Sequence, residues 1–121
     1  MSRFLYTALL YVLLPAALLR MLWRSRRAPA YRSRWRERFG VFPSGPVPRS
    51  LWVHAVSLGE VQAAAPLIRR MHQLYPSWPL VVTTTTPTGS QRVRQLFGED
   101  VLHSYFPYDI PRFICRFLDA A

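Results

Sequence analysis

The sequence contains no lysine, a single cysteine and few acidic residues. All sixteen of its basic residues are arginine, whereas Asp and Glu together number six. The lone Cys115 excludes an intrachain disulfide and fits a reducing compartment. A chain of 121 residues has room for one domain and is too short for a complete two-domain enzyme.

Several common binding motifs are missing as well. The five glycines never form G-x-G-x-x-G, which argues against a dinucleotide site. Gly40 and Gly45 have the spacing of a P-loop, but Pro46 stands where that motif requires lysine. The three histidines and one cysteine are too dispersed to predict a zinc site, so neither a metal nor a cofactor is expected.

The net charge of +10 is concentrated toward the N-terminus, where ten arginines and one acid, Glu37, precede Ser50. A basic arm that binds nucleic acid is one interpretation of such a segment. However, the segment directly follows an apolar run, which favours the phosphates of anionic lipids as its partner. We therefore expect no nucleic-acid partner.

The apolar run covers residues 4–19 and extends to Trp23, which is enough for a helix to cross a hydrocarbon layer of ~30 Å. Residues 1–23 are predicted to form a membrane-anchor helix that spans the bilayer or lies in its interface. One aromatic residue and four cations are expected to hold this anchor, with the following chain on the cytoplasmic side: Arg20, Trp23, Arg24, Arg26 and Arg27.

Two other interpretations of this run remain open. Residues 28–30, Ala-Pro-Ala, imitate the cleavage site of a signal peptide, although the arginines before them are untypical of one. A buried core helix is the second. After the anchor, residues 24–50 are expected to be an Arg-rich juxtamembrane segment and linker. Three prolines and Gly45 within residues 42–50 favour the linker, so the globular part is expected to begin at Leu51.

From Leu51 onward, strand and helix patterns alternate. Strands are predicted at 51–56, 80–85 and 101–106, and helices at 60–74, 90–97 and 110–118. This order predicts an α/β fold with a parallel sheet and right-handed crossovers. Ligands bind beyond the carboxyl ends of the strands in such sheets. The loops there are residues 57–60, 86–89 and 107–109. The first of them contains Glu60, and Asp109 in the last is expected to cap the helix at 110–118.

Residues 52–61 resemble the signature near the N-terminus of Kdo (3-deoxy-D-manno-oct-2-ulosonic acid) transferases. The signature reads Trp52-Val53-His54-Ala55-Val56-Ser57-Leu58-Gly59-Glu60-Val61. Further similar blocks follow in the same order: Pro66-Leu67-Ile68, Thr83-Thr84-Thr85-Thr86, Thr88-Gly89 and Tyr105-Phe106-Pro107-Tyr108-Asp109. The apolar anchor and the basic segment ending at Arg38-Phe39-Gly40 also fit, so the resemblance covers essentially the whole chain.

The resemblance implies a GT-B architecture, in which two Rossmann-like domains face a cleft, and residues 51–121 would form part of the first domain. It also implies inverting, metal-independent transfer of Kdo from CMP-Kdo to the lipid A precursor. This step of lipopolysaccharide biosynthesis takes place at the cytoplasmic face of the inner membrane. CMP-Kdo would bind a C-terminal domain that the sequence lacks, so the chain is expected to be the acceptor-side part and inactive alone.

The catalytic base of the family maps to Glu60, which is expected to take the proton of the attacking hydroxyl group. The pattern alone also permits Glu60 to be only a helix cap. Four residues of the same two loops are expected to contact the acceptor: Ser57, Gly59, Thr86 and Thr88. A non-catalytic alternative is a membrane-anchored basic protein that binds anionic lipid or a partner.

Overall fold

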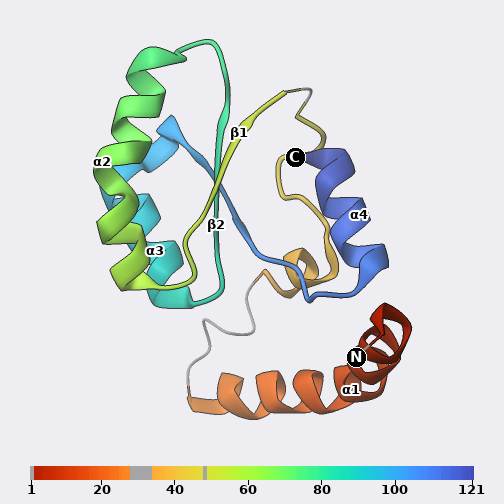
Figure 1. Ribbon diagram of the computed structural model, residues 1–121. Coiled ribbons are helices and arrows are strands. Elements are labelled where there is room, and N and C mark those ends of the chain that lie inside the picture. The colour runs from red at the N-terminus through yellow and green to blue at the C-terminus, as the bar shows by residue number, and fades with distance from the viewer. Residues whose placement is uncertain (1, 28–33, 48) are drawn as a thin grey trace.

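The computed structural model describes residues 2–27, 34–47 and 49–121, with the side chains at 25 and 27 left out (Figure 1). The Ala-Pro-Ala segment at 28–30 and the Arg27 side chain therefore lie outside the described residues. In the remainder, three strands and three helices follow a long N-terminal helix.

The sheet contains β1 (Leu51–His54), β2 (Leu80–Thr84) and β3 (Leu102–Tyr105). All pairings are parallel, and the strands lie in the order β1-β2-β3. Every residue of the central strand β2 is buried, as expected of a strand that is covered on both faces. The predicted α/β fold with a parallel sheet is thus confirmed.

Helices α2 (Leu58–Leu74) and α3 (Pro87–Phe97) cover one face of the sheet, and α4 (Pro111–Ala120) covers the other (Figure 1). Successive crossovers of one hand that step in one direction place their helices on the same face. Because side chains alternate along a strand, Val82 packs in the α2–α3 core and Val81 packs with Phe117 of α4.

Helix α3 begins three residues earlier than predicted. Residues 87–89 were expected to be a turn, but they form its first helical turn. Pro87 is tolerated there because the first N–H groups of a helix have no partner within the helix. The hydroxyl of Thr86 caps the helix by accepting a hydrogen bond from the backbone N–H of Gly89 at 3.1 Å.

Residues 42–50, which were predicted to be a linker, contain positions that pack against α4. Phe42 is 6% exposed, and its ring packs edge-on against Phe117 with the centroids 5.9 Å apart. The backbone N–H of Val47 donates to the carbonyl of Ala120 at 2.6 Å. The prolines and glycines therefore mark turns in a segment that closes the α4 core, and the globular part includes residues before Leu51.

A short 3-10 helix, η2 (Trp35–Phe39), covers the outer edge of β3. Arg34 donates through Nη2 to the carbonyl of His103 at 2.9 Å, and Glu37 accepts from the N–H of Tyr105 at 3.5 Å. These are the backbone groups that a further strand would pair. The two side chains also form an ion pair with each other at 2.6 Å. Together they satisfy hydrogen-bonding groups of a sheet edge that would otherwise be open to pairing with another chain.

The N-terminal helix α1 (Arg3–Arg27) lies beneath the carboxyl ends of the strands and bends along its length, which includes Pro15 (Figure 1). It is long and apolar enough to cross a membrane, as judged by length and composition. None of its most apolar window is buried, which contradicts the core-helix alternative. One stripe is half-buried, at Leu10, Leu14, Ala17 and Met21, and apolar residues on its other sides are exposed.

Two polar contacts join α1 to the loop that follows β3. The hydroxyl of Tyr6 donates to the carboxylate of Asp109 at 2.6 Å, and the hydroxyl of Tyr108 lies 3.8 Å from the sulfur of Met21. Asp109 was expected to cap the last helix, but the cap position is Ile110. Asp109 instead holds the N-terminal end of α1.

Candidate functional site

The loops after β1 and β2 are joined by backbone hydrogen bonds. The carbonyl of Val56 accepts from both the N–H and the hydroxyl of Thr85, each at 2.9 Å. A side chain at Gly89 would lie 3.4 Å from the carbonyl carbon of Ser57, so the first turn of α3 packs on the loop that precedes α2. The structure thus brings the two loops singled out by the strand–helix order into direct contact.

Glu60 lies in the first turn of α2 and is exposed. Its Oε2 accepts a hydrogen bond from the backbone N–H of Val56, which fixes the carboxylate against the end of β1. Because Val56 precedes Ser57, the N-cap residue of α2, this bond holds the loop and does not cap an N–H group of the helix. The other oxygen, Oε1, makes no hydrogen bond to any described residue. Because a carboxylate accepts at both oxygens, one oxygen can hold the loop while the other receives a proton.

Ser57 and Gly59 flank this carboxylate. Ser57 is the N-cap residue of α2, but its half-buried hydroxyl makes no capping bond. Gly59 is exposed, and a Cβ at this position would meet no atom within 4 Å. Packing therefore does not require glycine at position 59, and the space above the loop is open.

Thr86 and Thr88 differ in their surroundings. Thr86 is half-buried, and its hydroxyl caps the N-terminus of α3, so its main role is to hold the structure of the loop. Thr88 is exposed, and its hydroxyl donates to that of Thr86 at 3.4 Å. Of these two residues, Thr88 is the one that presents its side chain to solvent beside the Ser57 loop.

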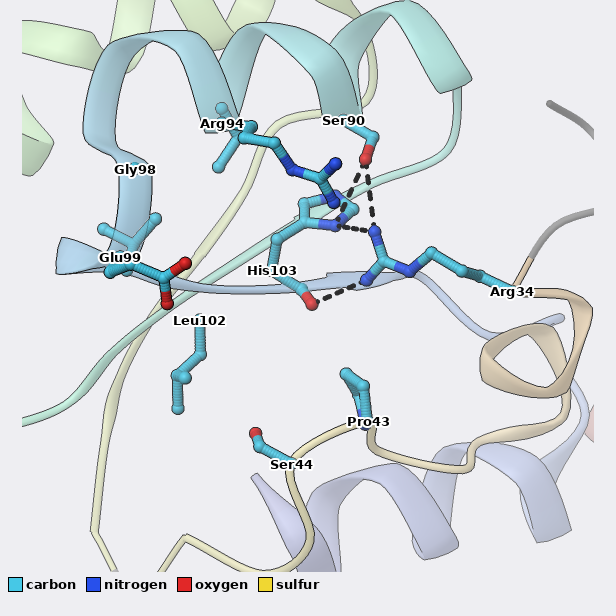
Figure 2. A pocket seen from close by; sticks show the side chains of 11 residues that line it. Arg34, Pro43, Ser44, Ser90, Arg94, Gly98, Glu99, Leu102 and His103 are labelled. Carbon is cyan, nitrogen blue, oxygen red and sulfur yellow. Dashed lines mark hydrogen bonds between the residues drawn. The ribbon is translucent and has the colours of Figure 1, made fainter.

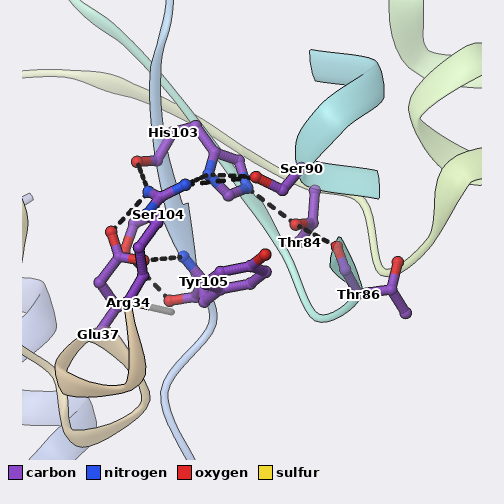
Figure 3. A network of polar contacts seen from close by, with 8 residues as sticks. All are labelled: Arg34, Glu37, Thr84, Thr86, Ser90, His103, Ser104 and Tyr105. Carbon is purple, nitrogen blue, oxygen red and sulfur yellow. Dashed lines mark hydrogen bonds and ion pairs between the residues drawn. The ribbon is translucent and has the colours of Figure 1, made fainter. Parts of the chain in front are cut away.

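A chain of polar contacts runs from the covered sheet edge to the Thr86 loop (Figure 3). Arg34 Nη1 lies 3.0 Å from Nδ1 of His103, and Nε2 of His103 lies 2.8 Å from the hydroxyl of Thr84. Since arginine only donates, Nδ1 must accept, and the ring proton is on Nε2. Thr84 then donates to the carbonyl of Thr86 at 3.4 Å, which ties the α3 cap to the sheet.

This arrangement keeps His103 neutral. Burial, and then the charge of Arg34, lower the pKa of His103 to about 3. A proton on Nδ1 would face a guanidinium N–H that has no acceptor to offer. Burial also raises the pKa of Glu37, although its bond to Arg34 opposes that shift.

A cavity of about 280 Å³ opens beside the same network, as Figure 2 shows. Its wall includes Arg34, Ser90 and His103, and it continues past Gly98 toward Leu102. Leu102 is the first residue of β3, so part of this cavity lies at the amino end of that strand. Ligands of parallel α/β sheets bind at the opposite end, and we do not assign the acceptor to this cavity.

A second cavity, of about 240 Å³, lies between α1 and the carboxyl end of the sheet. We call it the arginine cavity; its lining residues are Ala17, Arg20, Met21, Arg24, Arg38, Thr85 and Tyr108. Sequence reasoning missed Arg38, Thr85 and Tyr108 as site residues, because only the folded chain brings these three segments together. It had assigned Arg20 and Arg24 to membrane anchoring.

The other predicted anchoring residues lie on the same helix. Trp23 is exposed, as is Arg26, and neither lines the arginine cavity. Among the described residues, no group of three or more His, Cys, Asp or Glu side chains could hold a metal ion. The candidate site is therefore built from one carboxylate, hydroxyl groups and arginines.

A carboxylate that follows a parallel strand and faces open space beside polar loops is typical of an α/β ligand-binding domain. Comparison with known proteins identifies which kind. Residues 33–121 match the family described as 3-deoxy-D-manno-octulosonic-acid transferase (kdotransferase), and the chain belongs to this family.

Curated relatives agree over nearly the whole chain. The 3-deoxy-D-manno-octulosonic acid transferase of Haemophilus influenzae is 45% identical over 98% of this chain and 28% of its own length. A probable mitochondrial one from Arabidopsis thaliana is 41% identical over 94% of this chain and 26% of its own length. That of Bordetella pertussis is 36% identical, over 98% and 29% respectively. The chain thus spans less than a third of these relatives, and no solved structure matches it.

Proposed function

We propose that this chain forms the acceptor-side part of a glycosyltransferase of lipopolysaccharide biosynthesis, which transfers Kdo from CMP-Kdo to the lipid A precursor with inversion. Family membership supports this proposal. The observation that carries it is the position of Glu60, an exposed carboxylate with one uncommitted oxygen at the carboxyl edge of the sheet.

In this mechanism, a hydroxyl oxygen of the acceptor attacks the anomeric carbon of Kdo from the face opposite the leaving group. The new C–O bond forms as the bond to the phosphate of CMP breaks, and the hydroxyl proton passes to Oε1 of Glu60. A positioned base of this kind typically contributes ~10²–10⁴-fold to the rate.

The loops around Glu60 would orient the acceptor. The hydroxyl groups of Ser57 and Thr88 and the open space above Gly59 are suited to contact a sugar. Thr86 would act mainly by fixing the loop through its cap. CMP-Kdo would bind a second, C-terminal domain of a GT-B enzyme, with residues 51–121 as part of the first Rossmann-like domain.

Helix α1 would place this site at the cytoplasmic face of the inner membrane. Tyr6 and Met21 are fifteen positions apart, about 22 Å along a helix, and both contact the loop at 108–109. A helix that contacts the same loop at two points so far apart lies along the domain. We therefore favour an anchor that lies in the membrane interface, with its exposed apolar side in lipid.

A chimera tests this function. Residues 1–121 would be joined to the remaining part of the Haemophilus influenzae relative, and Kdo transfer from CMP-Kdo to the lipid A precursor would be measured. We expect the chimera to be active and Glu60→Gln to lose ~10²-fold or more in kcat. The control is Glu99→Gln, an exposed glutamate outside the loops at 57–60 and 86–89. Full activity of the Glu60→Gln chimera would remove Glu60 from the mechanism.

The non-catalytic alternative makes a different prediction. If the chain only binds anionic lipid, the chimera would be inactive even when it is folded and membrane-bound. Vesicle binding by the chain would then weaken with salt and would not depend on Glu60.

A further inference from the structure

Two cavities lie next to each other along α1. The arginine cavity is one, and a larger cavity of about 440 Å³ is the other. The larger one is lined by Leu18, Met21, Leu22, Trp35 and Phe39, and we call it the apolar cavity. Met21 lines both, so the two cavities adjoin at this residue.

The arginine cavity has the chemistry of a phosphate site. Arg20 and Arg24 come from successive turns of α1, and Arg38 faces them from η2. Arg38 is held in place by a 2.7 Å bond to the carbonyl of Thr85 and by the ring of Tyr105, 4.4 Å from its guanidinium carbon. No carboxylate is among the described residues that line the cavity. Arginines arranged in this way bind phosphate oxygens through paired N–H groups.

The apolar cavity has the chemistry of an acyl-chain site. Leu18 and Leu22 face it from successive turns of α1, and Trp35 packs edge-on against Phe39 with the ring centroids 5.6 Å apart. Trp35 is nonetheless 50% exposed. Aromatic side chains of this kind are enriched where a membrane meets water, which fits a cavity that opens toward the interface.

We propose that the two cavities form one binding site for the acceptor lipid, an acylated sugar phosphate. Its phosphate binds between Arg20, Arg24 and Arg38, and one of its acyl chains enters the apolar cavity. Calling the lipid the acceptor rests on the function proposed above. The link to that function is Thr85, which lines the arginine cavity and bonds to Val56, the residue that holds the Glu60 carboxylate. The sugar of a lipid bound there extends toward Glu60.

The test uses the full 121-residue chain in neutral maltoside micelles, with bound lipids counted by native mass spectrometry. Three probes are titrated: the lipid A precursor, phosphatidylglycerol and inorganic phosphate. We expect the lipid A precursor to bind at least tenfold more tightly than phosphatidylglycerol, and inorganic phosphate not to bind. Trp35→Ala should also weaken binding of the precursor, because it opens the apolar cavity.

Arg20→Gln and Arg26→Gln form a matched pair. Each removes one exposed cation from α1, but only Arg20 lines the cavity, and it makes no hydrogen bond to any described residue. We expect Arg20→Gln to weaken binding of the lipid A precursor roughly tenfold and Arg26→Gln to leave it within twofold. Equal losses in the two variants would mean general attraction to anionic lipid and would overturn the site.

The remaining outcomes are equally decisive. Equal affinity for phosphatidylglycerol would mean a site for bulk membrane lipid, and equal affinity for inorganic phosphate would mean that no acyl chain is bound; either result overturns the proposal. If the chain still binds the lipid A precursor in an Arg20-dependent way but the chimera cannot transfer Kdo, the proposed function is refuted and the site is not. If the chimera is active but the lipid A precursor no longer binds in this way, the site is refuted and the proposed function is not.

Discussion

Removing the Arg34 side chain should destabilise the fold strongly. Arg34 bonds to Glu37 at 2.6 Å, to the carbonyl and ring of His103 at 2.9 and 3.0 Å, and to Ser90 at 3.3 Å. Arg34→Met leaves Glu37, which is 4% exposed, without the cation it is paired with, and it leaves the His103 carbonyl at the edge of β3 unpaired. Breaking a buried ion pair from one side costs ~3–5 kcal/mol. The loss should be at the lower end of this range, because Arg34 is itself partly exposed and because burial raises the pKa of Glu37, which can then take up a proton. We therefore expect Arg34→Met to lower the free energy of unfolding by about 3 kcal/mol.

The assay is urea unfolding of the full chain in neutral detergent, followed by circular dichroism and tryptophan fluorescence. Arg36→Met is the matched control, because Arg36 lies exposed on the same 3-10 helix, and it should cost less than ~0.5 kcal/mol. The double variant Arg34→Met/Glu37→Met should lose less than the sum of the single variants, since neither charge is then left alone. Equal stability of Arg34→Met and Arg36→Met would refute the account of the β3 edge.

Two further predictions concern backbone strain and pH. Gly40 and Gly45 both have positive φ, but only at Gly40 would a Cβ overlap the carbonyl oxygen of Phe113. In the same urea titration, Gly40→Ala should therefore lower the free energy of unfolding by at least ~2 kcal/mol more than Gly45→Ala. Because its pKa falls from 6.5 to about 3 on folding, His103 binds fewer protons in the folded chain, and stability is lost as pH drops through that range. His103→Gln should flatten the decline in melting temperature between pH 7 and pH 5, and an unchanged decline would contradict the assigned neutral state.

The alternating elements of the fold were predictable because each depends on local pattern. The apolar run at 80–84 and the helical spacing of Val61, Ile68 and Met71 follow from burial on one or both faces, whatever the rest of the chain does. Phe42 was not predictable in this way, because prolines and glycines report turns and do not report whether the turn is buried. Arg34 and Glu37 cover a sheet edge through two side chains, and no sequence period marks such a contact.

The candidate site, too, could be predicted from the sequence only in part. Glu60 could be placed at the carboxyl edge of the sheet from the strand–helix order alone, and the structure adds its bond to Val56. The arginine cavity could not be predicted, since Arg38 and Tyr108 are seventy positions apart and meet only when η2 docks beside β3. Local pattern assigned Asp109 to a helix cap. It could not reveal the contact with Tyr6, because that contact joins residues from distant parts of the chain.

The most direct test of the central claim is chemical rescue of Glu60→Ala in the chimera. Removing the carboxylate should abolish most of the Kdo transfer, and added formate should restore part of the rate, because a small carboxylate can occupy the vacated space and accept the proton. Thr88→Ala, on the neighbouring loop, should show no response to formate. Near-normal transfer by Glu60→Ala without formate would contradict the assignment of Glu60 as the base.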